Sequence, residues 1–219
     1  MARIDRDLLT GLLLASLFFW GAARSELLER RKLTAIREEE LLYYPSGYAV
    51  RGAAMGYETA AADLAWLRGI QYYGEHRLTD QKYDLIGHVM DIVTELDPSF
   101  VQPYVFGAFV MAQEMKETER GLDLLERGMR ANPTNWRLAF EVGFLHYVCR
   151  HDYVSASRYF TWASRMPDHE PYVERFAAFA SQRAGNTGMA ILLWKQVLAT
   201  GNEYMQEVAK RELQRLGVR

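Results

Sequence analysis

Three side chains that commonly bind metals lie within six residues of one another: His146, Cys149 and His151. His146 and Cys149 are three residues apart, so a helix would place them on one face. A structural zinc site needs three or four such ligands in defined spacing. His151 falls in a predicted turn, away from that face. We therefore expect packing and surface exposure to account for these residues, with no metal and no cofactor.

Other patterns that carry chemistry are missing from the sequence. The glycines Gly47, Gly52 and Gly56 lack the spacing and the Lys-Ser/Thr ending of a phosphate-binding loop. No serine lies in a Gly-x-Ser-x-Gly elbow. A single cysteine excludes an intrachain disulfide and a Cys-x-x-Cys-His haem motif. The sequence therefore predicts a protein that is not an enzyme.

The composition predicts an ordered protein with a substantial core. Of 219 residues, 49% are hydrophobic and 13% are aromatic, which is enough apolar surface to exclude wholesale disorder. The formal net charge of −2 gives no basic excess of the kind that nucleic-acid binding requires. We expect no nucleic acid and no small-molecule substrate among the partners.

Signals that end helices recur at a nearly constant interval. The dipeptides Asp97-Pro98, Asn132-Pro133, Met166-Pro167 and Thr200-Gly201 are separated by 35, 34 and 34 residues. A period near 34 is typical of a helix-turn-helix solenoid, in which pairs too small to bury their own apolar faces stack on one another. From about Tyr57 onward no alternating β pattern is present, so the sequence predicts an all-α fold.

The segments between these turns resemble the tetratricopeptide repeat family over residues 57–201. The third unit is the clearest, with large Phe140 and Tyr147 in its first helix. The small–large–small face of its second helix comes from Ala156, Phe160 and Ala163, and small residues of this kind let helices approach closely. The resemblance implies a right-handed α-solenoid of about four helix pairs, with residues 202–216 as a C-terminal capping helix.

The other units match this pattern less fully. The first unit supplies Trp66, Ile70 and Tyr73, with a long turn at residues 77–83 before its second helix. The fourth unit carries Glu174 where a large residue is usual. The lead-in to the first unit also resembles that of bacterial membrane-anchored repeat proteins.

The resemblance implies that the first helix of each pair lines an inner surface that binds partners. The candidate groove consists of Leu67, Gln71, Phe106, Val110, Gln113, Glu141, Leu145, Tyr172, Arg175, Phe179 and Arg183. Its centre is apolar, with charges toward one end, which suits an amphipathic helix or an extended peptide. Alternatively, the chain's own amphipathic segment from Leu27 to Leu41 fills the groove.

The N-terminal region contains a charge-free hydrophobic stretch. Residues 8–23 lie between Asp7 and Arg24 and would span about 24 Å as a helix, against a hydrocarbon core of about 30 Å. Trp20 suits the headgroup boundary. We predict a single transmembrane helix. The alternatives are a signal peptide cleaved near residues 21–23 and a helix of a soluble core.

These segments define three predicted regions: an anchor at 1–24, an amphipathic helix and linker at 25–56, and a repeat domain at 57–219. A turn follows Tyr44, and residues 51–55 are expected to form a linker or a tight helix start. Basic residues nearly balance across the span, but a short amino-terminal tail favours a periplasmic repeat domain on a bacterial inner membrane.

Together, these features predict a membrane-anchored scaffold or adaptor that binds proteins or peptides through an apolar groove. Anchoring through residues 8–23 raises the effective concentration of the repeats for membrane-bound partners. The alternative is a constitutive structural or assembly subunit of a multi-protein membrane complex of secretion, pilus, transporter or respiratory type.

Overall fold

The computed structural model describes Ser16, Trp20, Arg24 and residues 46–218. Pro45–Arg219 forms one compact unit. Within its described residues the unit is built of helices and has no strand, which confirms the predicted all-α class. The helices are α2 (Gly47–Ala54), α3 (Glu58–Arg77), α4 (Ile86–Leu96), α5 (Val101–Phe109), the π-helical turn η1 (Val110–Glu114), α6 (Thr118–Ala131), α7 (Trp136–Val148), α8 (Tyr153–Ala163), α9 (Tyr172–Arg183), α10 (Thr187–Thr200) and α11 (Glu203–Arg215).

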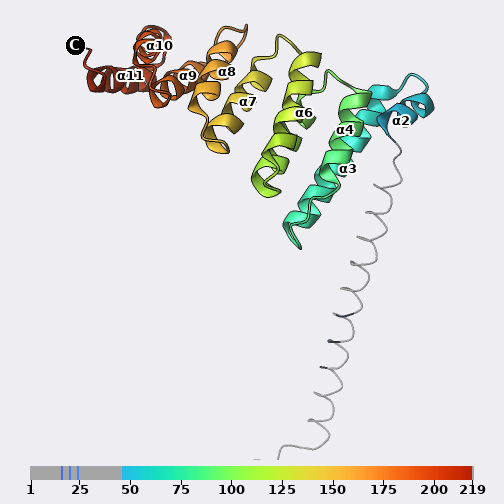
Figure 1. Ribbon diagram of the computed structural model, residues 1–219. Helices are drawn as coiled ribbons and strands as arrows, with labels where there is room; N and C mark the ends of the chain where they lie inside the picture. The colour runs from blue at the N-terminus through green and yellow to red at the C-terminus, as the bar shows by residue number, and fades with distance from the viewer. Residues whose placement is uncertain (1–15, 17–19, 21–23, 25–45, 219) are drawn as a thin grey trace, which may run out of the picture. The chain divides into compact units, whose positions relative to one another are not determined.

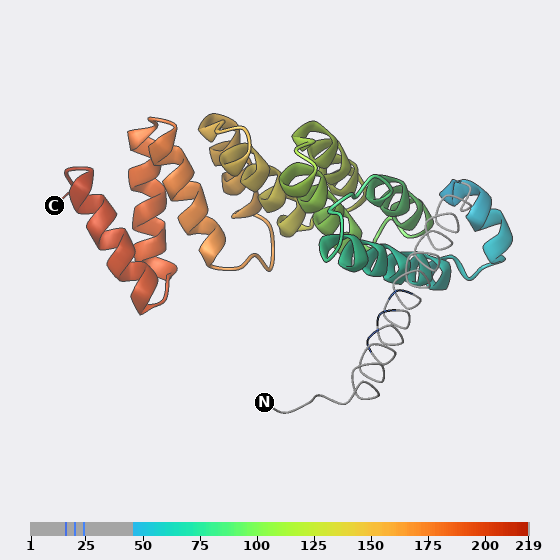
Figure 2. The same cartoon turned by 90° about the horizontal axis from the view of Figure 1, so that it is seen from below.

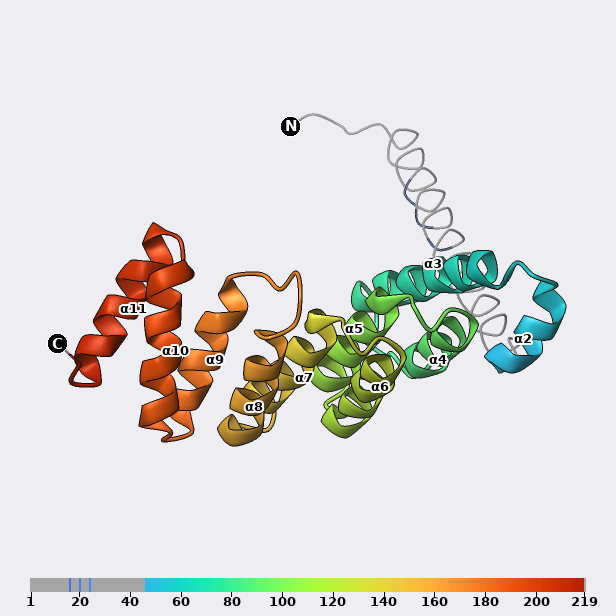
Figure 3. The ribbon, with the colours of Figure 1, turned by 90° about the horizontal axis from the view of Figure 1, so that it is seen from above.

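Consecutive helices of this unit pack side by side in chain order (Figures 1 and 3). They form four pairs: α3 with α4, α5 and η1 with α6, α7 with α8, and α9 with α10. We call α3, α5, α7 and α9 the first helices, and α4, α6, α8 and α10 the second helices. The last helix, α11, packs against α10 at the C-terminal end (Figure 2).

The four turns predicted from proline and glycine all separate helices. Three of them fall between pairs, and Thr200-Gly201 separates α10 from α11. The long turn within the first pair is also present, although it runs from Leu78 to Leu85 and so ends two residues later than expected. Proline ends these helices because it lacks an N–H donor and restricts the residue before it.

Side-chain caps fix where four of the helices begin. In each case the side-chain oxygen of the capping residue accepts a hydrogen bond of 3.0–3.1 Å from a backbone N–H in the first turn. The capping residues are Asn135, Asp152, Asn186 and Asn202. Each such cap stabilises its helix by about 1 kcal/mol.

Glycines and alanines at the contacts allow the helices to approach closely. A Cβ atom on Gly128 would lie 2.8 Å from the ring of Tyr104, and one on Gly143 would lie 2.9 Å from the ring of Phe160. Ala156 and Ala163, the predicted small residues on either side of Phe160, are fully buried. The core formed this way continues without a break from α7 to α11.

Glu174 takes a different role from the large residue that the repeat pattern would place there. It is buried in α9, where its Oε1 accepts a hydrogen bond of 3.0 Å from Gln196 and its Oε2 one of 2.9 Å from Thr200. His169 lies 3.5 Å away across an ion pair. Burying an isolated carboxylate costs free energy, and these partners offset that cost for Glu174. The two helices of the fourth pair are therefore joined by hydrogen bonds as well as by apolar contact.

The helix from Val101 does not continue as a regular α-helix. At η1 the backbone widens, so that Met115 N donates to Val110 O at 3.1 Å and Glu117 N to Met111 O at 2.8 Å. A π-helical turn contains one residue more than an α-helical turn and rotates the side chains that follow it relative to an α-helical pattern. Val110, the first residue of η1, is fully buried.

The segment at residues 51–55 is not a linker. It contains the end of α2, which packs on α4, where Arg51 donates a hydrogen bond to the backbone oxygen of Glu95. The helix stops at Met55, which adopts a left-handed conformation. The compact unit therefore includes residues before 57, the predicted start of the repeat domain.

The predicted anchor and the amphipathic helix that follows it lie outside the described residues, apart from Ser16, Trp20 and Arg24, which are helical. Among the described residues, no helix is both long and apolar enough to cross a bilayer.

Replacing Gly121 by alanine tests the close contact between α5 and α6. A Cβ atom there would lie 2.8 Å from the backbone oxygen of Ala108, which cannot move without its helix. We expect Gly121→Ala to lower the free energy of unfolding by about 1–3 kcal/mol, measured by urea denaturation. The control is Gly74→Ala in α3, where a Cβ atom would meet nothing within 4 Å. It should stabilise the protein by about 1 kcal/mol, and equal losses in the two variants would contradict this packing.

Candidate functional site

The predicted groove residues of the first two pairs do not form a common surface. Leu67 is 56% exposed and Gln71 is exposed. Phe106 packs edge-on between Trp66 and Tyr73, and fully buried Val110 offers no surface to a partner. Gln113 is committed internally, since its Nε2 donates to the sulfur of Cys149 at 2.9 Å.

In the third pair, the predicted residues are also largely internal. Leu145 is buried, because it faces α6 near Gly121 and therefore lies between pairs instead of at the surface. Glu141 is half-buried, with its Oε1 3.7 Å from Arg137. Burial raises the pKa of the Glu141 carboxyl, and Arg137 partly opposes that rise.

The four predicted residues of the fourth pair come together on α9. Tyr172 packs edge-on against Phe140 at 5.4 Å between ring centroids, and Arg175 lies over the ring of Phe176. Phe179 and Arg183 lie one turn apart and both line a cavity. We call this the α9 cavity.

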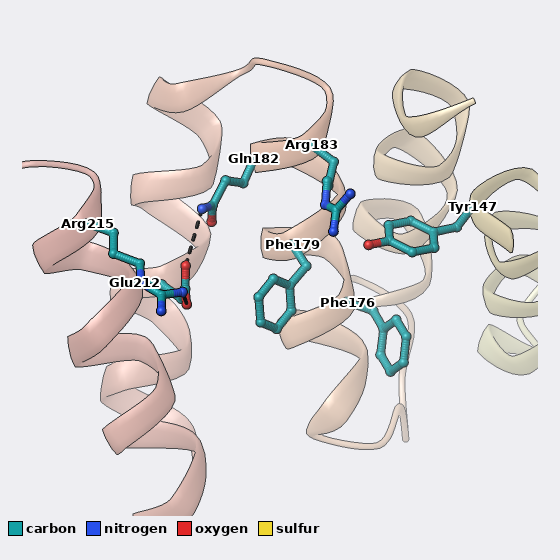
Figure 4. Close-up of a pocket in the computed structure, with 7 residues that line it drawn as sticks. All are labelled: Tyr147, Phe176, Phe179, Gln182, Arg183, Glu212 and Arg215. Carbon is teal, nitrogen blue, oxygen red and sulfur yellow. Dashed lines mark hydrogen bonds and ion pairs between the residues drawn. The ribbon is translucent and has the colours of Figure 1, made fainter. Parts of the chain in front are cut away.

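The α9 cavity has a volume of about 630 Å³ and lies between α9 and its two neighbours α7 and α11 (Figure 4). This size is within the range of cavities that bind ligands. It is lined by aromatic rings together with polar and charged groups: Tyr147, Phe176, Phe179, Gln182, Arg183, Glu212 and Arg215.

The aromatic part of the cavity is held rigidly from behind. Phe179 stands edge-on against Trp194, with ring centroids 4.7 Å apart, and Trp194 is fully buried. Phe176 contacts Phe140 at 5.2 Å and Phe160 at 5.5 Å. Because each ring is fixed by a buried neighbour, the apolar surface is formed in advance of any ligand.

A chain of hydrogen bonds orders the polar wall of the cavity. The indole N–H of Trp194 donates to Gln182 Oε1 at 3.1 Å, and Gln182 Nε2 donates to Glu212 Oε2 at 3.2 Å. The other oxygen of buried Glu212 accepts from Arg215 at 2.7 Å. This chain links α9, α10 and α11 and leaves Glu212 fully occupied by internal donors.

Arg183 supplies the uncompensated charge of the site. Its guanidinium lies over the ring of Tyr153 at 5.8 Å, and it forms no ion pair with any residue that the structure describes. Arg215 is already paired with Glu212. The cavity therefore combines an apolar aromatic surface with a cation at its edge that no described carboxylate neutralises, which suits a ligand with an apolar group and a nearby carboxylate.

Sequence reasoning found part of this site and missed the rest. Phe179 and Arg183 are among the predicted groove residues, whereas the other lining residues are not: Tyr147, Phe176, Gln182, Glu212 and Arg215. The two α11 residues were missed because that helix was interpreted as a cap. Extending the 34-residue period past Gly201 would have identified α11 as the equivalent of a further first helix.

The three side chains considered as metal ligands have separate environments. His146 is buried and stacks on Tyr159, Cys149 accepts a hydrogen bond from Gln113, and His151 lies in the turn before α8 with φ of 53°. In the part of the chain that the structure describes, no group of three or more His, Cys, Asp or Glu side chains could hold a metal ion.

Comparison with protein-family models finds no match for this chain, and a search of curated proteins also finds no match.

The buried imidazole of His146 predicts a pH dependence of stability. Burial lowers the pKa of His146 below 6.5, with Asp152 at 3.5 Å partly opposing the shift and nearby Arg150 adding to it. The unfolded chain therefore binds a proton at a higher pH than the folded chain does. Stability contributed by neutral His146 should be complete above about pH 6.5 and decline as the pH falls below it.

Urea denaturation at pH 7.5 and at pH 5 measures this decline. His146→Gln should lose less stability than the parent between the two conditions. The pKa of Asp152 is lowered chiefly by its hydrogen bond with Ser155. Protonation of Asp152 therefore changes the stability only at pH values below about 3.8, and does not contribute to the difference between pH 7.5 and pH 5. An identical decline in the parent and the variant would show that His146 is not the cause.

Proposed function

We propose that this chain is a membrane-anchored helical-repeat scaffold of the tetratricopeptide type, and that its α9 cavity binds a segment of a protein partner. The observation that carries the proposal is the cavity itself. Rigid rings of Phe176 and Phe179 line it together with the guanidinium of Arg183, which forms no ion pair within the part of the chain that the structure describes. Aromatic side chains and arginine are the residues most often responsible for binding energy at protein interfaces.

The repeat assignment is supported by the agreement of three features. Helix pairs follow one another with turns 34 or 35 residues apart, each pair packs on the next, and small residues occupy the closest contacts. A right-handed solenoid is the arrangement that this family leads us to expect. In such arrays the first helices carry the binding surface, and the α9 cavity is lined by α7, α9 and α11.

The expected ligand is an amphipathic helix or an extended peptide of the partner. A large apolar side chain would pack on Phe176 and Phe179, and a carboxylate would accept hydrogen bonds from Arg183. Gln182 and Glu212 shape the wall, since their hydrogen bonds are already made within the protein.

The charge-free stretch at residues 8–23 supports attachment to a bacterial inner membrane. A tethered array meets membrane-bound partners at a raised effective concentration, so a modest affinity of the cavity is sufficient. The short amino-terminal tail favours a periplasmic position for the repeats.

Site-specific photo-crosslinking tests partner binding at the cavity. A benzophenone amino acid in place of Tyr147, which lines the cavity, should give an adduct of discrete mass in intact cells. In place of Tyr204, which is 65% exposed on α11 but lies outside the cavity, it should not. Arg183→Glu should weaken the Tyr147-position adduct about ten-fold, because it places like charges together.

The matched control is Arg68→Glu, an equal charge change at an exposed site on α3. It should leave the adduct unchanged. Loss of the adduct in both charge variants, or adducts of equal yield at positions 147 and 204, would reject the cavity as the binding site. An adduct that co-purifies at fixed stoichiometry would instead favour the constitutive complex subunit.

Deletion of residues 8–23 tests the anchor. The parent chain should remain with membranes through carbonate extraction, and the deleted chain should appear in the soluble fraction. Alkaline phosphatase fused after Arg219 should be active if the repeats are periplasmic. A parent chain that is extracted by carbonate would argue against a transmembrane helix.

A further inference from the structure

A second surface, on the second helices, presents side chains of a different character. Val154, Arg158 and Trp162 lie four residues apart, so they share one face of α8, and Arg165 follows in the turn after the helix. Val154 is 59% exposed and Trp162 is 48% exposed. A large aromatic side chain is thus held in solvent between two arginines.

This face borders a hollow of about 530 Å³ between α8 and α10, which we call the α8–α10 hollow. Its walls carry neutral hydrogen-bonding groups as well as Met189: Ser157, Thr161 and Asn186. The side-chain oxygen Oδ1 of Asn186 accepts a hydrogen bond from Met189 N as a helix cap, which leaves the side-chain NH₂ group as a donor. The hollow therefore combines donors, apolar surface and positive charge.

The electrostatic balance of this surface is one-sided. Neither α8 nor α10 contains an Asp or a Glu, and none lines the hollow. Arg158 and Arg165 are exposed and form no ion pair with any residue that the structure describes. Asp152, at the start of α8, is already engaged by Ser155.

An opposing charge lies on another second helix, α6. A smaller hollow beside Trp162 is lined by Glu126 and Arg130 of α6, together with Met129 and Tyr159. This adds one charge of each sign, so the surface around Trp162 keeps its positive excess. An anionic partner is therefore the complement of this face.

We propose that the α8–α10 hollow and the exposed face of α8 bind the headgroups of anionic phospholipids. Arg158 and Arg165 pair with lipid phosphates, and Thr161 and Asn186 donate hydrogen bonds to them. Trp162 enters the boundary between headgroups and acyl chains, as tryptophan does in membrane interfaces. The proposal rests on the membrane attachment proposed above, but it is independent of the α9 cavity.

A bilayer fits this surface better than an acidic peptide for two reasons. The exposed indole is flanked on both sides by arginines. In this pattern the apolar side chain enters the bilayer while the cationic groups stay at the level of the lipid phosphates. A chain tethered to a membrane also meets anionic lipid at high local concentration. An acidic peptide remains the competing occupant, and the experiment below separates the two.

The test uses the full chain reconstituted in vesicles of phosphatidylcholine, alone or mixed in equal parts with phosphatidylglycerol. A fluorophore is attached at Val154→Cys, in a Cys149→Ser background, and is quenched by lipids that carry a nitroxide at the headgroup. We expect strong quenching only in the phosphatidylglycerol vesicles. Arg158→Gln with Arg165→Gln should lower the docking equilibrium constant about 25-fold, since each basic residue near an anionic surface contributes about 0.7 of a decade.

The matched control is Arg68→Gln with Arg211→Gln, the same charge change at exposed sites on α3 and α11. It should leave the quenching unchanged, and a fluorophore at Arg68→Cys should be quenched weakly in both vesicles. Equal quenching in the two vesicle types, or equal loss in both double variants, would overturn the proposal. A benzophenone at position 162 gives a further test. The proposal would also be overturned if this benzophenone formed an adduct with a protein, and if the yield of that adduct, but not the quenching, depended on Arg158 and Arg165.

Membrane attachment through the predicted anchor is measured separately in the same samples. Retention of the chain on phosphatidylcholine vesicles in high salt reports the transmembrane attachment, because salt screens the contacts of exposed arginines but not an inserted helix. Failure of that retention counts against the anchor, whereas failure of the phosphatidylglycerol-dependent quenching counts against the α8 face.

Discussion

The packing of Phe160 between α7 and α9 sets the geometry of the C-terminal half of the array. Its fully buried ring lies 5.1 Å from Phe140 and 5.5 Å from Phe176, so one side chain contacts both neighbouring first helices. The contact depends on Gly143, where any Cβ atom would displace the ring. Since Phe176 also forms a wall of the α9 cavity, the shape of that cavity follows from the core behind it.

Buried polar residues determine how α9, α10 and α11 are aligned along their axes. Apolar contact alone tolerates sliding and repacking, whereas a buried carboxylate is stable only where its donors meet it. Glu174 requires Gln196 and Thr200 of α10, and Glu212 of α11 requires Gln182 of α9. These bonds couple α9 to α10 and α11, and Glu212 in turn holds Arg215 at the α9 cavity.

The pairing of helices divides their surfaces between two kinds of interaction. Aromatic rings and Arg183 line the α9 cavity among α7, α9 and α11, and Arg183 forms no ion pair with any residue that the structure describes. The helices α8 and α10 contain no carboxylate, and α8 exposes Trp162 beside cations. A scaffold that binds a protein through one set and a lipid surface through the other would hold its partner at a defined orientation to the bilayer. Both surfaces are formed by the same core, so neither requires a conformational change.

The sequence by itself determined the helical class and the positions of the turns, because proline and capping residues act on the local backbone wherever the helix lies. It also singled out Phe179 and Arg183, which both line the α9 cavity. Only the tertiary structure decided that Val110 is buried, and that Glu212 completes the cavity from α11. Periodicity defines the faces of a single helix, but which face remains exposed depends on the neighbours that pack against it.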